Sequence, residues 1–264
     1  MKFWSGLAMA AAATLLTACN SDFNISTSSS GVPLAELDTS GAAPTGISLA
    51  GPDRVIVTSG EGLTINVEGD PDVTEGVRFE LDGDTLEISR EGNWMGSSVA
   101  TVRVTMPTPT ELSLAGSGEI EVDRLGTGEG AEVSIAGSGE SRVGQIDADR
   151  LEVSVAGSGS LEAAGRVQTL ELSIAGSGDL DLRNVTVGDA EVSIAGSGDA
   201  RFTSNGNVDA SIMGSGDVEV FGNANCSVSS MGSGEVRCNR TSARAANTAD
   251  ESREADARAE DSAQ

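Results

Sequence analysis

Carboxylate side chains at a fixed spacing are the part of this sequence with the clearest potential for chemistry. They stand three residues after the first glycine of a recurring Gly-Ser-Gly triplet, as in Glu140, Asp179, Asp199 and Asp217. Carboxylate oxygens are the ligands that calcium and other hard cations prefer. The pattern makes these four residues candidates for low-affinity divalent-cation binding, while a solvated acidic surface without metal is the alternative interpretation.

The composition argues against catalysis. The chain has no His and its only Lys is Lys2, so a nucleophile would lack its usual base. Carboxylate pairs of the glycosidase kind carry no information in a chain with 41 acidic residues. We therefore expect neither catalytic residues nor a resident cofactor. A glycan-binding module or a carbohydrate-active enzyme is the alternative, although aromatic residues make up only 3% of the chain.

Two cysteines near the end of the repeats form a candidate disulfide. Cys226 and Cys238 lie twelve residues apart, at offsets from the glycine triplets where another copy places the apolar residues Leu170 and Leu182. An exported protein can form disulfides, and this bond would fasten the last coils. Two buried free thiols, which pack as small hydrophobic side chains, are the alternative.

The first residues resemble a bacterial lipoprotein signal. Lys2 precedes an apolar run over residues 3–16 and the sequence LTAC, which ends at Cys19. The run is too short to span a bilayer as a mature helix. The resemblance implies a signal peptide over 1–18 and acylation of Cys19, with chains such as palmitate as the membrane anchor. Asn20 favours the outer membrane, on its periplasmic side or at the surface. The alternative is an ordinary signal peptide with an incidental cysteine.

The Gly-Ser-Gly triplet repeats with a period near twenty residues. Its first glycine recurs at spacings of 18 to 21 residues, at Gly116, Gly137, Gly157, Gly176, Gly196, Gly214 and Gly232. Such a period is typical of a solenoid, in which each repeat is one unit that stacks on the next. Glycine permits the positive φ angle of a sharp corner and lets stacked backbones come close. We therefore interpret the triplet mainly as a corner.

Apolar and polar residues alternate on both sides of each triplet. The apolar residues before Gly176 are Leu170, Leu172 and Ile174, and Leu180 follows it. A spacing of two indicates strands with one buried face. Every repeat has a strand, a corner, a second strand and a more variable third segment. This pattern predicts an all-β fold, a three-sided parallel β-helix with one coil of about 18–21 residues per repeat.

The chain divides into four parts by composition. Residues 46–240 are expected to form the β-helical domain, of which 46–109 are less regular and predict irregular N-terminal cap coils. Residues 19–45 are rich in Ser, Thr, Gly and Ala, which predicts a flexible, lipid-anchored linker. Residues 241–264 contain no large apolar residue and predict a disordered acidic tail.

The net charge is strongly negative, at −25 from 16 basic and 41 acidic residues. This balance excludes nucleic acid as a partner, because phosphates need a basic face. It also disfavours direct binding to anionic lipid, so membrane attachment rests on the lipid anchor. Arg201 and Arg237 stand beside acids and are expected to relieve charge repulsion.

The sequence resembles a known family over residues 46–240. The segments PDRVIVTSGEGLTINVEGD, DGDTLEISREGNWMGS and VRVTMPTPTELSLAGSGEIEV, followed by serial copies of SIAGSGD, are similar to the head GIN domain of the auto-transporter adhesin family. The resemblance implies a secreted or lipid-anchored β-helical domain with no established biochemical activity.

These observations predict a non-enzymatic lipoprotein of the cell envelope. Its β-helical rod would present an acidic, serine-lined surface for adhesion or envelope structure. The expected partners are the membrane, through the lipid anchor, and an envelope protein or glycan.

Overall fold

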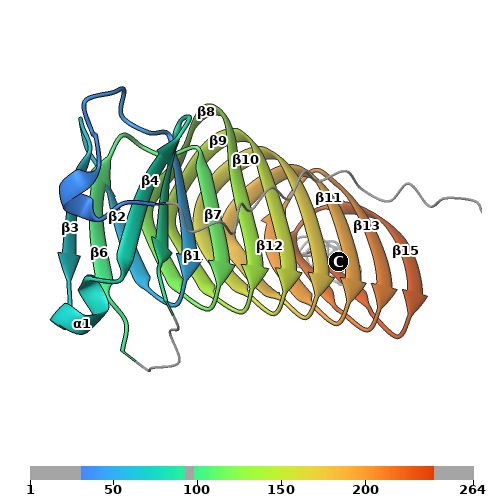
Figure 1. Ribbon diagram of the computed structural model, residues 1–264. Coiled ribbons are helices and arrows are strands. Elements are labelled where there is room, and N and C mark those ends of the chain that lie inside the picture. The colour runs from blue at the N-terminus through green and yellow to red at the C-terminus, as the bar shows by residue number, and fades with distance from the viewer. Residues whose placement is uncertain (1–30, 93–97, 241–264) are drawn as a thin grey trace, which may run out of the picture.

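Strands wound around one axis form an elongated rod (Figure 1). The computed structural model describes residues 31–92 and 98–240. The N-terminal elements are η1 (Leu34–Glu36), β1 (Gly46–Gly51), β2 (Arg54–Ser59), β3 (Thr64–Glu68), α1 (Pro71–Thr74), β4 (Val77–Asp82), β5 (Thr85–Arg90) and β6 (Thr101–Met106). The rod continues with β7 (Glu111–Gly116), β8 (Glu119–Gly137), β9 (Glu140–Gly157), β10 (Ser160–Gly176), β11 (Asp179–Gly196), β12 (Asp199–Ser204), β13 (Asn207–Gly214), β14 (Val218–Gly222), β15 (Asn225–Gly232) and β16 (Val236–Arg240).

Strand β9 shows how one coil is built. Its buried residues fall into three groups, separated by pairs of consecutive exposed residues, and these groups are the three sides of the coil. The groups are Ser141 and Val143, then Ile146 and Ala148, then Leu151, Val153 and Val155. The predicted three-sided parallel β-helix is therefore confirmed.

Successive coils pair in parallel and in register, so identical positions stack into columns. Leu151 pairs with Leu170, Leu170 with Ala190, and Ala190 with Val208. All four side chains are buried. Burying apolar surface contributes about 25 cal/mol per Å2, and the aliphatic columns fill the bore in this way along the rod.

The Gly-Ser-Gly triplets form the corners, and Gly176 shows why glycine is required there. Its φ angle is +133°, and a Cβ at this position would lie 2.2 Å from the carbonyl oxygen of Gly157 in the preceding coil. The neighbouring Ser177 N–H donates a hydrogen bond to that same oxygen, at 2.7 Å. Any side chain at Gly176 would therefore collide with backbone that the corner needs.

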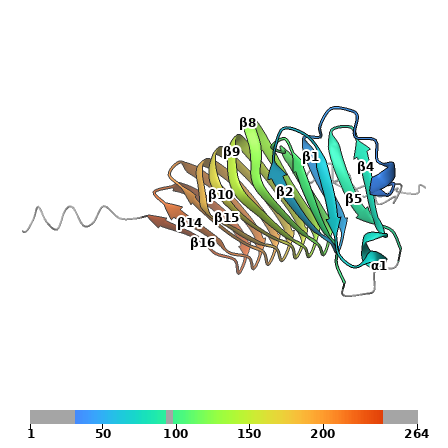
Figure 2. The same cartoon turned by 90° about the vertical axis from the view of Figure 1, so that its left-hand side faces the viewer.

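The N-terminal end is irregular, as predicted, and its outermost strands pair antiparallel. Strand β4 pairs antiparallel with β5, and β3 pairs antiparallel with β6. The β4–β5 hairpin turns at Gly83, whose φ angle is +59°. The two antiparallel pairs close the first coils as a cap: β4 and β5 lie beside β1 in Figure 2, and β3 and β6 lie beside β2 in Figure 1.

Part of the predicted linker also belongs to this cap. Val32 exchanges backbone hydrogen bonds with Phe79, at 2.9 and 2.8 Å, and Leu34 and Leu37 pack against the core. Residues 31–45 are thus held on the domain and are not a free tether, because backbone pairing and apolar contacts fix them. The signal peptide, residues 19–30 of the linker and the tail 241–264 lie outside the described residues and stay predictions.

The C-terminal end has no comparable cover within the described residues. Strand β15 pairs with β13 alone, and β16 with β14 alone.

Among residues 31–92 and 98–240, no helical segment has the length and apolar character needed to cross a membrane.

Candidate functional site: an acidic and serine-lined face

Two outward columns run side by side along the rod on the strand that precedes each corner. The acid column consists of Glu111, Glu132, Glu152, Glu171, Glu191 and Asp209. The serine column consists of Ser48, Ser113, Ser134, Ser154, Ser173, Ser193, Ser211 and Ser229. Both columns point outward because they alternate with the buried residues of the same strands. We call these two columns together the acidic–serine face.

The acid column carries little compensating positive charge. Neighbouring strands lie about 4.8 Å apart, and like charges directly opposite each other on paired strands destabilise a sheet. Within residues 31–92 and 98–240, one arginine forms an ion pair with this column, Arg150 with Glu171. Partial desolvation, followed by the charges of Glu111 and Glu152, raises the pKa of the Glu132 carboxyl. Most carboxylates of the acid column therefore lack a positive partner that would offset their mutual repulsion.

A groove of about 390 Å3 opens on this face where the backbone of β8 is irregular. Gly126 and Gly128 have φ angles of +89° and +72°, and the register between β8 and β9 shifts between Leu125 and Gly128. The side chains that line the groove are mostly acidic or hydroxylated: Thr110, Glu111, Thr127, Glu129, Ala131, Glu132, Arg150 and Glu152. Such a groove offers acceptors to cationic or hydroxyl-bearing groups of a partner.

The strand that follows each corner carries a second acidic face, on which several acids have arginine partners. Arg142 forms ion pairs with Glu119 and Glu140. Arg201 lies 2.8 Å from Asp179 and 3.5 Å from Asp199. We call this the arginine-balanced face. The prediction that Arg201 relieves charge repulsion is confirmed, and Arg237 does the same for Glu235 at 2.7 Å.

The four candidate metal ligands lie on this arginine-balanced face. Glu140 is paired with Arg142, and Asp179 and Asp199 with Arg201. Asp199 and Asp217 also each accept a backbone N–H from the next coil. In the described part of the chain, no three His, Cys, Asp or Glu side chains are grouped to hold a metal ion. Calcium binding stays a prediction for which these residues offer no shared coordination site.

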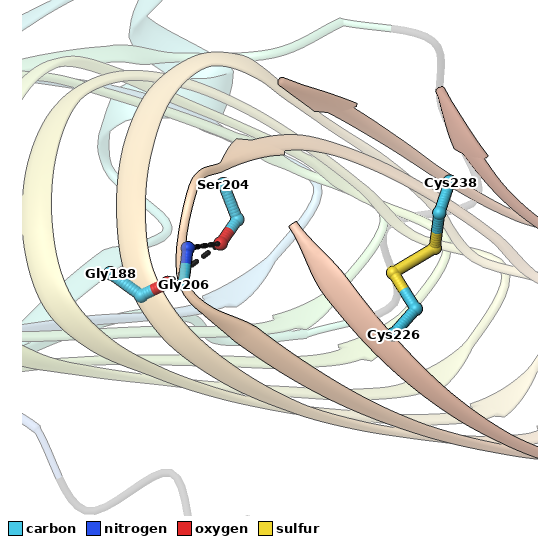
Figure 3. Close-up of a disulfide and its surroundings, with 5 residues drawn as sticks. All are labelled: Gly188, Ser204, Gly206, Cys226 and Cys238. Atoms are coloured by element: carbon cyan, nitrogen blue, oxygen red, sulfur yellow. Dashed lines mark hydrogen bonds between the residues drawn. A yellow bond between two sulfur atoms is a disulfide. The ribbon is translucent and has the colours of Figure 1, made fainter. Parts of the chain in front are cut away.

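Cys226 and Cys238 are joined by a disulfide at the C-terminal end, with Cα atoms 6.6 Å apart (Figure 3). The bond links β15 to β16 and so crosses between two sides of the last coil.

Nearby, the hydroxyl of Ser204 donates to the Gly188 carbonyl at 2.6 Å. It also accepts the Gly206 N–H at 3.2 Å. Cys19 lies outside the described residues, so its acylation stays a prediction.

A buried ion pair at the N-terminal end escaped the sequence analysis. The Asp53 carboxylate, 1% exposed, accepts from Arg90 Nε at 2.9 Å and from the backbone N–H of Ala100 at 2.6 Å. In the first corner Gly51, Pro52 and Asp53 take the place of the triplet, as the pairing of Gly51 with Gly116 shows. An acid in place of the triplet's second glycine was the available signal.

Comparison with known proteins adds a family and a set of related folds. Residues 43–224 match the family model described as "Putative auto-transporter adhesin, head GIN domain". No curated protein matches the sequence.

Three solved structures share the fold over 75% of this chain. A putative adhesin from Bacteroides fragilis NCTC 9343 is matched over 93% of its length, with 19% identity and a TM-score of 0.68. A putative lipid binding protein from Parabacteroides distasonis ATCC 8503 is matched over 93%, with 24% identity and a TM-score of 0.59. A putative adhesin from Parabacteroides merdae ATCC 43184 is matched over 92%, with 18% identity and a TM-score of 0.54.

Proposed function

The chain belongs to the family of the putative auto-transporter adhesin head GIN domain, and from this premise we propose that it is a non-enzymatic adhesive lipoprotein of the cell envelope. The rod would be held at the outer membrane through lipid on Cys19. The acidic–serine face would be its binding surface, and an envelope protein or a glycan its partner.

The unbalanced charge of the acidic–serine face is the observation that supports this proposal most. Several acids on the arginine-balanced face have arginine partners, among them Glu119, Glu140 and Asp179, whereas the acid column has a single ion pair among the described residues, that of Glu171. Carboxylates that repel one another gain from a partner that supplies positive charge or hydrogen-bond donors. A long, repetitive face also suits a weak contact repeated many times, which multivalency strengthens.

Other functions have less support. The chain has no His, and two of its aromatic side chains, Phe79 and Phe202, are buried at 1% and 0% exposure. This leaves few surfaces for stacking on sugar rings, so a glycan partner would have to bind through hydrogen bonds. One structural neighbour is described as a putative lipid binding protein. Here, however, aliphatic side chains fill the bore of the described rod.

A triple variant that removes three negative charges tests the binding face. Glu132→Gln, Glu152→Gln and Glu191→Gln together remove three carboxylates from the acid column. Glu121→Gln, Glu162→Gln and Glu219→Gln remove the same charge from the arginine-balanced face and serve as the matched control. Binding to isolated envelopes and to a glycan array is expected to fall at least about tenfold in the first variant only. Equal binding by the two triple variants would contradict the proposed binding face. Turnover of a glycan would contradict a non-enzymatic function.

The anchor is tested separately. Cys19→Ser is expected to leave the protein unprocessed or release it into the soluble periplasmic fraction. Unchanged processing and membrane fractionation would remove the lipoprotein part of the proposal and leave the binding face standing.

A further inference from the structure

Strand β15, at the open end of the rod, carries no charged residue, in contrast to β7 to β11 and β13 of the same face. Its sequence is NCSVSSMG, and Ser227 stands where Asp209 and the other acids stand in earlier coils. Proteins normally protect a free strand edge with charge, because its unpaired N–H and C=O groups can join another chain. The one strand of the acidic–serine face that ends the rod lacks that protection.

The same strand exposes apolar side chains. Val228 occupies an inward position, paired with Ala210, which is 3% exposed, yet Val228 itself is 50% exposed. Met231 is 71% exposed and pairs with Met213, which is 63% exposed. Val228 is left open because no coil follows it among the described residues. The end of the rod is therefore suited to receive one more strand.

The C-terminal tail is poorly suited to cover this edge. Residues 241–264 contain no Val, Leu, Ile, Met or aromatic residue, and six acids stand against three arginines. Such a segment has no apolar side chain larger than Ala to place over Val228. A second copy of β15 does supply one.

We propose that two copies of the chain associate end to end, with β15 pairing antiparallel to β15 of the second copy. Inward residues must face inward on both strands, which restricts the register to steps of two. The central register places Val228 opposite Val228 of the second copy and Cys226 opposite Ser230. No charge meets a like charge across this pairing. The aliphatic bore would then continue from one rod into the other.

Charge favours the ends over the sides for such contact. From residue 223 to residue 240 the charged residues are Glu235, Arg237 and Arg240, so the last coil lacks the excess of acid found along the rod. Side-by-side association would instead bring acid columns together. The contact area at a rod's end is small, so we expect a weak dimer, with a Kd of roughly 1–100 μM.

Sedimentation equilibrium on the exported chain carrying Cys19→Ser tests the proposal without acyl chains. The parent is expected to form dimers between about 1 and 500 μM in 0.15 M salt. Val228→Lys is expected to weaken the dimer at least about a hundredfold, because two lysines would be opposed. Val99→Lys is the control, since Val99 is also 50% exposed but belongs to the N-terminal part of the fold. Its dimer should match that of the parent.

A cysteine substitution tests the register. Val228→Cys is expected to give a covalent dimer on mild oxidation, because opposed residues of paired strands lie within disulfide range, whereas Val99→Cys is not. A parent that is monomeric throughout overturns the proposal, as does a Val228→Lys variant that dimerises like the parent. If a monomeric parent shows slow amide exchange in β15 that removal of 241–264 accelerates, the tail covers the edge instead.

Discussion

The two ends of the rod protect their terminal strands in different ways. The N-terminal end covers its first coils with the antiparallel pairs β4–β5 and β3–β6 and buries an ion pair, Asp53–Arg90. The C-terminal end has a disulfide between its last strands and leaves Val228 half exposed. One end is thus closed by additional chain, and the other is fastened but open. The contrast suggests that the N-terminal end is a terminus of the fold and the C-terminal end a surface for contact.

The largest expected effect separates the middle of the rod from its open end. Gly176→Ala places a Cβ 2.2 Å from the Gly157 carbonyl oxygen, and Gly232→Ala places one 2.0 Å from the Gly214 oxygen. The geometry is the same, but Gly176 has coils on both sides. We expect Gly176→Ala to lower the free energy of unfolding by at least about 4 kcal/mol. Gly232→Ala should cost less, because the last coil can separate locally. Urea unfolding measures both, and equal losses would mean that the last coil is no looser than the middle.

The next effect breaks the closed end. Asp53→Asn keeps the shape of the side chain but leaves the guanidinium of Arg90 buried without its counter-charge. Removing one partner of a buried pair costs about 3–5 kcal/mol, and we expect a loss of that size in thermal or urea unfolding. Asp84→Asn, at an exposed turn position of the same end, is the control and should change little. A loss below about 1 kcal/mol for Asp53→Asn would show that the pair is not a main element of the cap.

The third effect loosens the open end. The double variant Cys226→Ser, Cys238→Ser is expected to lose about 3 kcal/mol, from the chain entropy of a loop of this size. Intact-mass measurement after alkylation without reductant should first show no modified thiol in the parent. Two alkylated thiols would refute the bond, and their absence together with an unchanged stability would refute its structural role.

The smallest effect is a pH dependence at the closed end. Burial, followed by the charges of Glu80 and Asp82, raises the pKa of the Glu87 carboxyl. The folded protein therefore holds this proton more tightly than the unfolded chain, so stability is lost as the pH rises from the ordinary Glu range through the folded pKa. Glu87→Gln should stabilise by a few tenths of a kcal/mol at neutral pH and give no gain near pH 3.

The matched change at the open end sharpens this test. Glu235→Gln removes the partner of Arg237, at 2.7 Å, and should bring no gain at either pH. Thermal melts of Glu87→Gln and Glu235→Gln at neutral pH and near pH 3 measure these differences in stability. A gain for Glu87→Gln that persists in acid would show that ionisation is not its cause.

The regular part of the fold could be predicted because each residue repeats its role. Leu170, Leu172 and Ile174 were expected to face inward, and all three are buried. The direction of strand pairing at the N-terminal end could not be predicted in the same way, since alternation is identical in parallel and antiparallel strands. The Gly83-Asp84 turn was the remaining signal for the hairpin.

Charge partners were harder to predict than strands. Positions on successive coils are adjacent in space although they are about twenty residues apart, so Arg201 reaches Asp179 in the coil before it. The strand-pairing register decides which charged residues meet. The irregular cap has no repeat from which this register could be predicted. The pair of Asp53 and Arg90, 37 residues apart, depends on the cap and therefore stayed hidden. The difference between the two faces emerged only once the columns were aligned.

The identity of neighbouring corners has a consequence for how this protein can change over generations. The seven residues SIAGSGD at 173–179 recur unchanged at 193–199, and the two copies stack in register, from Ser173 on Ser193 to Asp179 on Asp199. Gain or loss of one whole copy in the gene would join surfaces that already match, so no new packing would have to be found. Rod length can therefore evolve in whole steps of about 4.8 Å, while both ends and the pattern of each face are inherited intact.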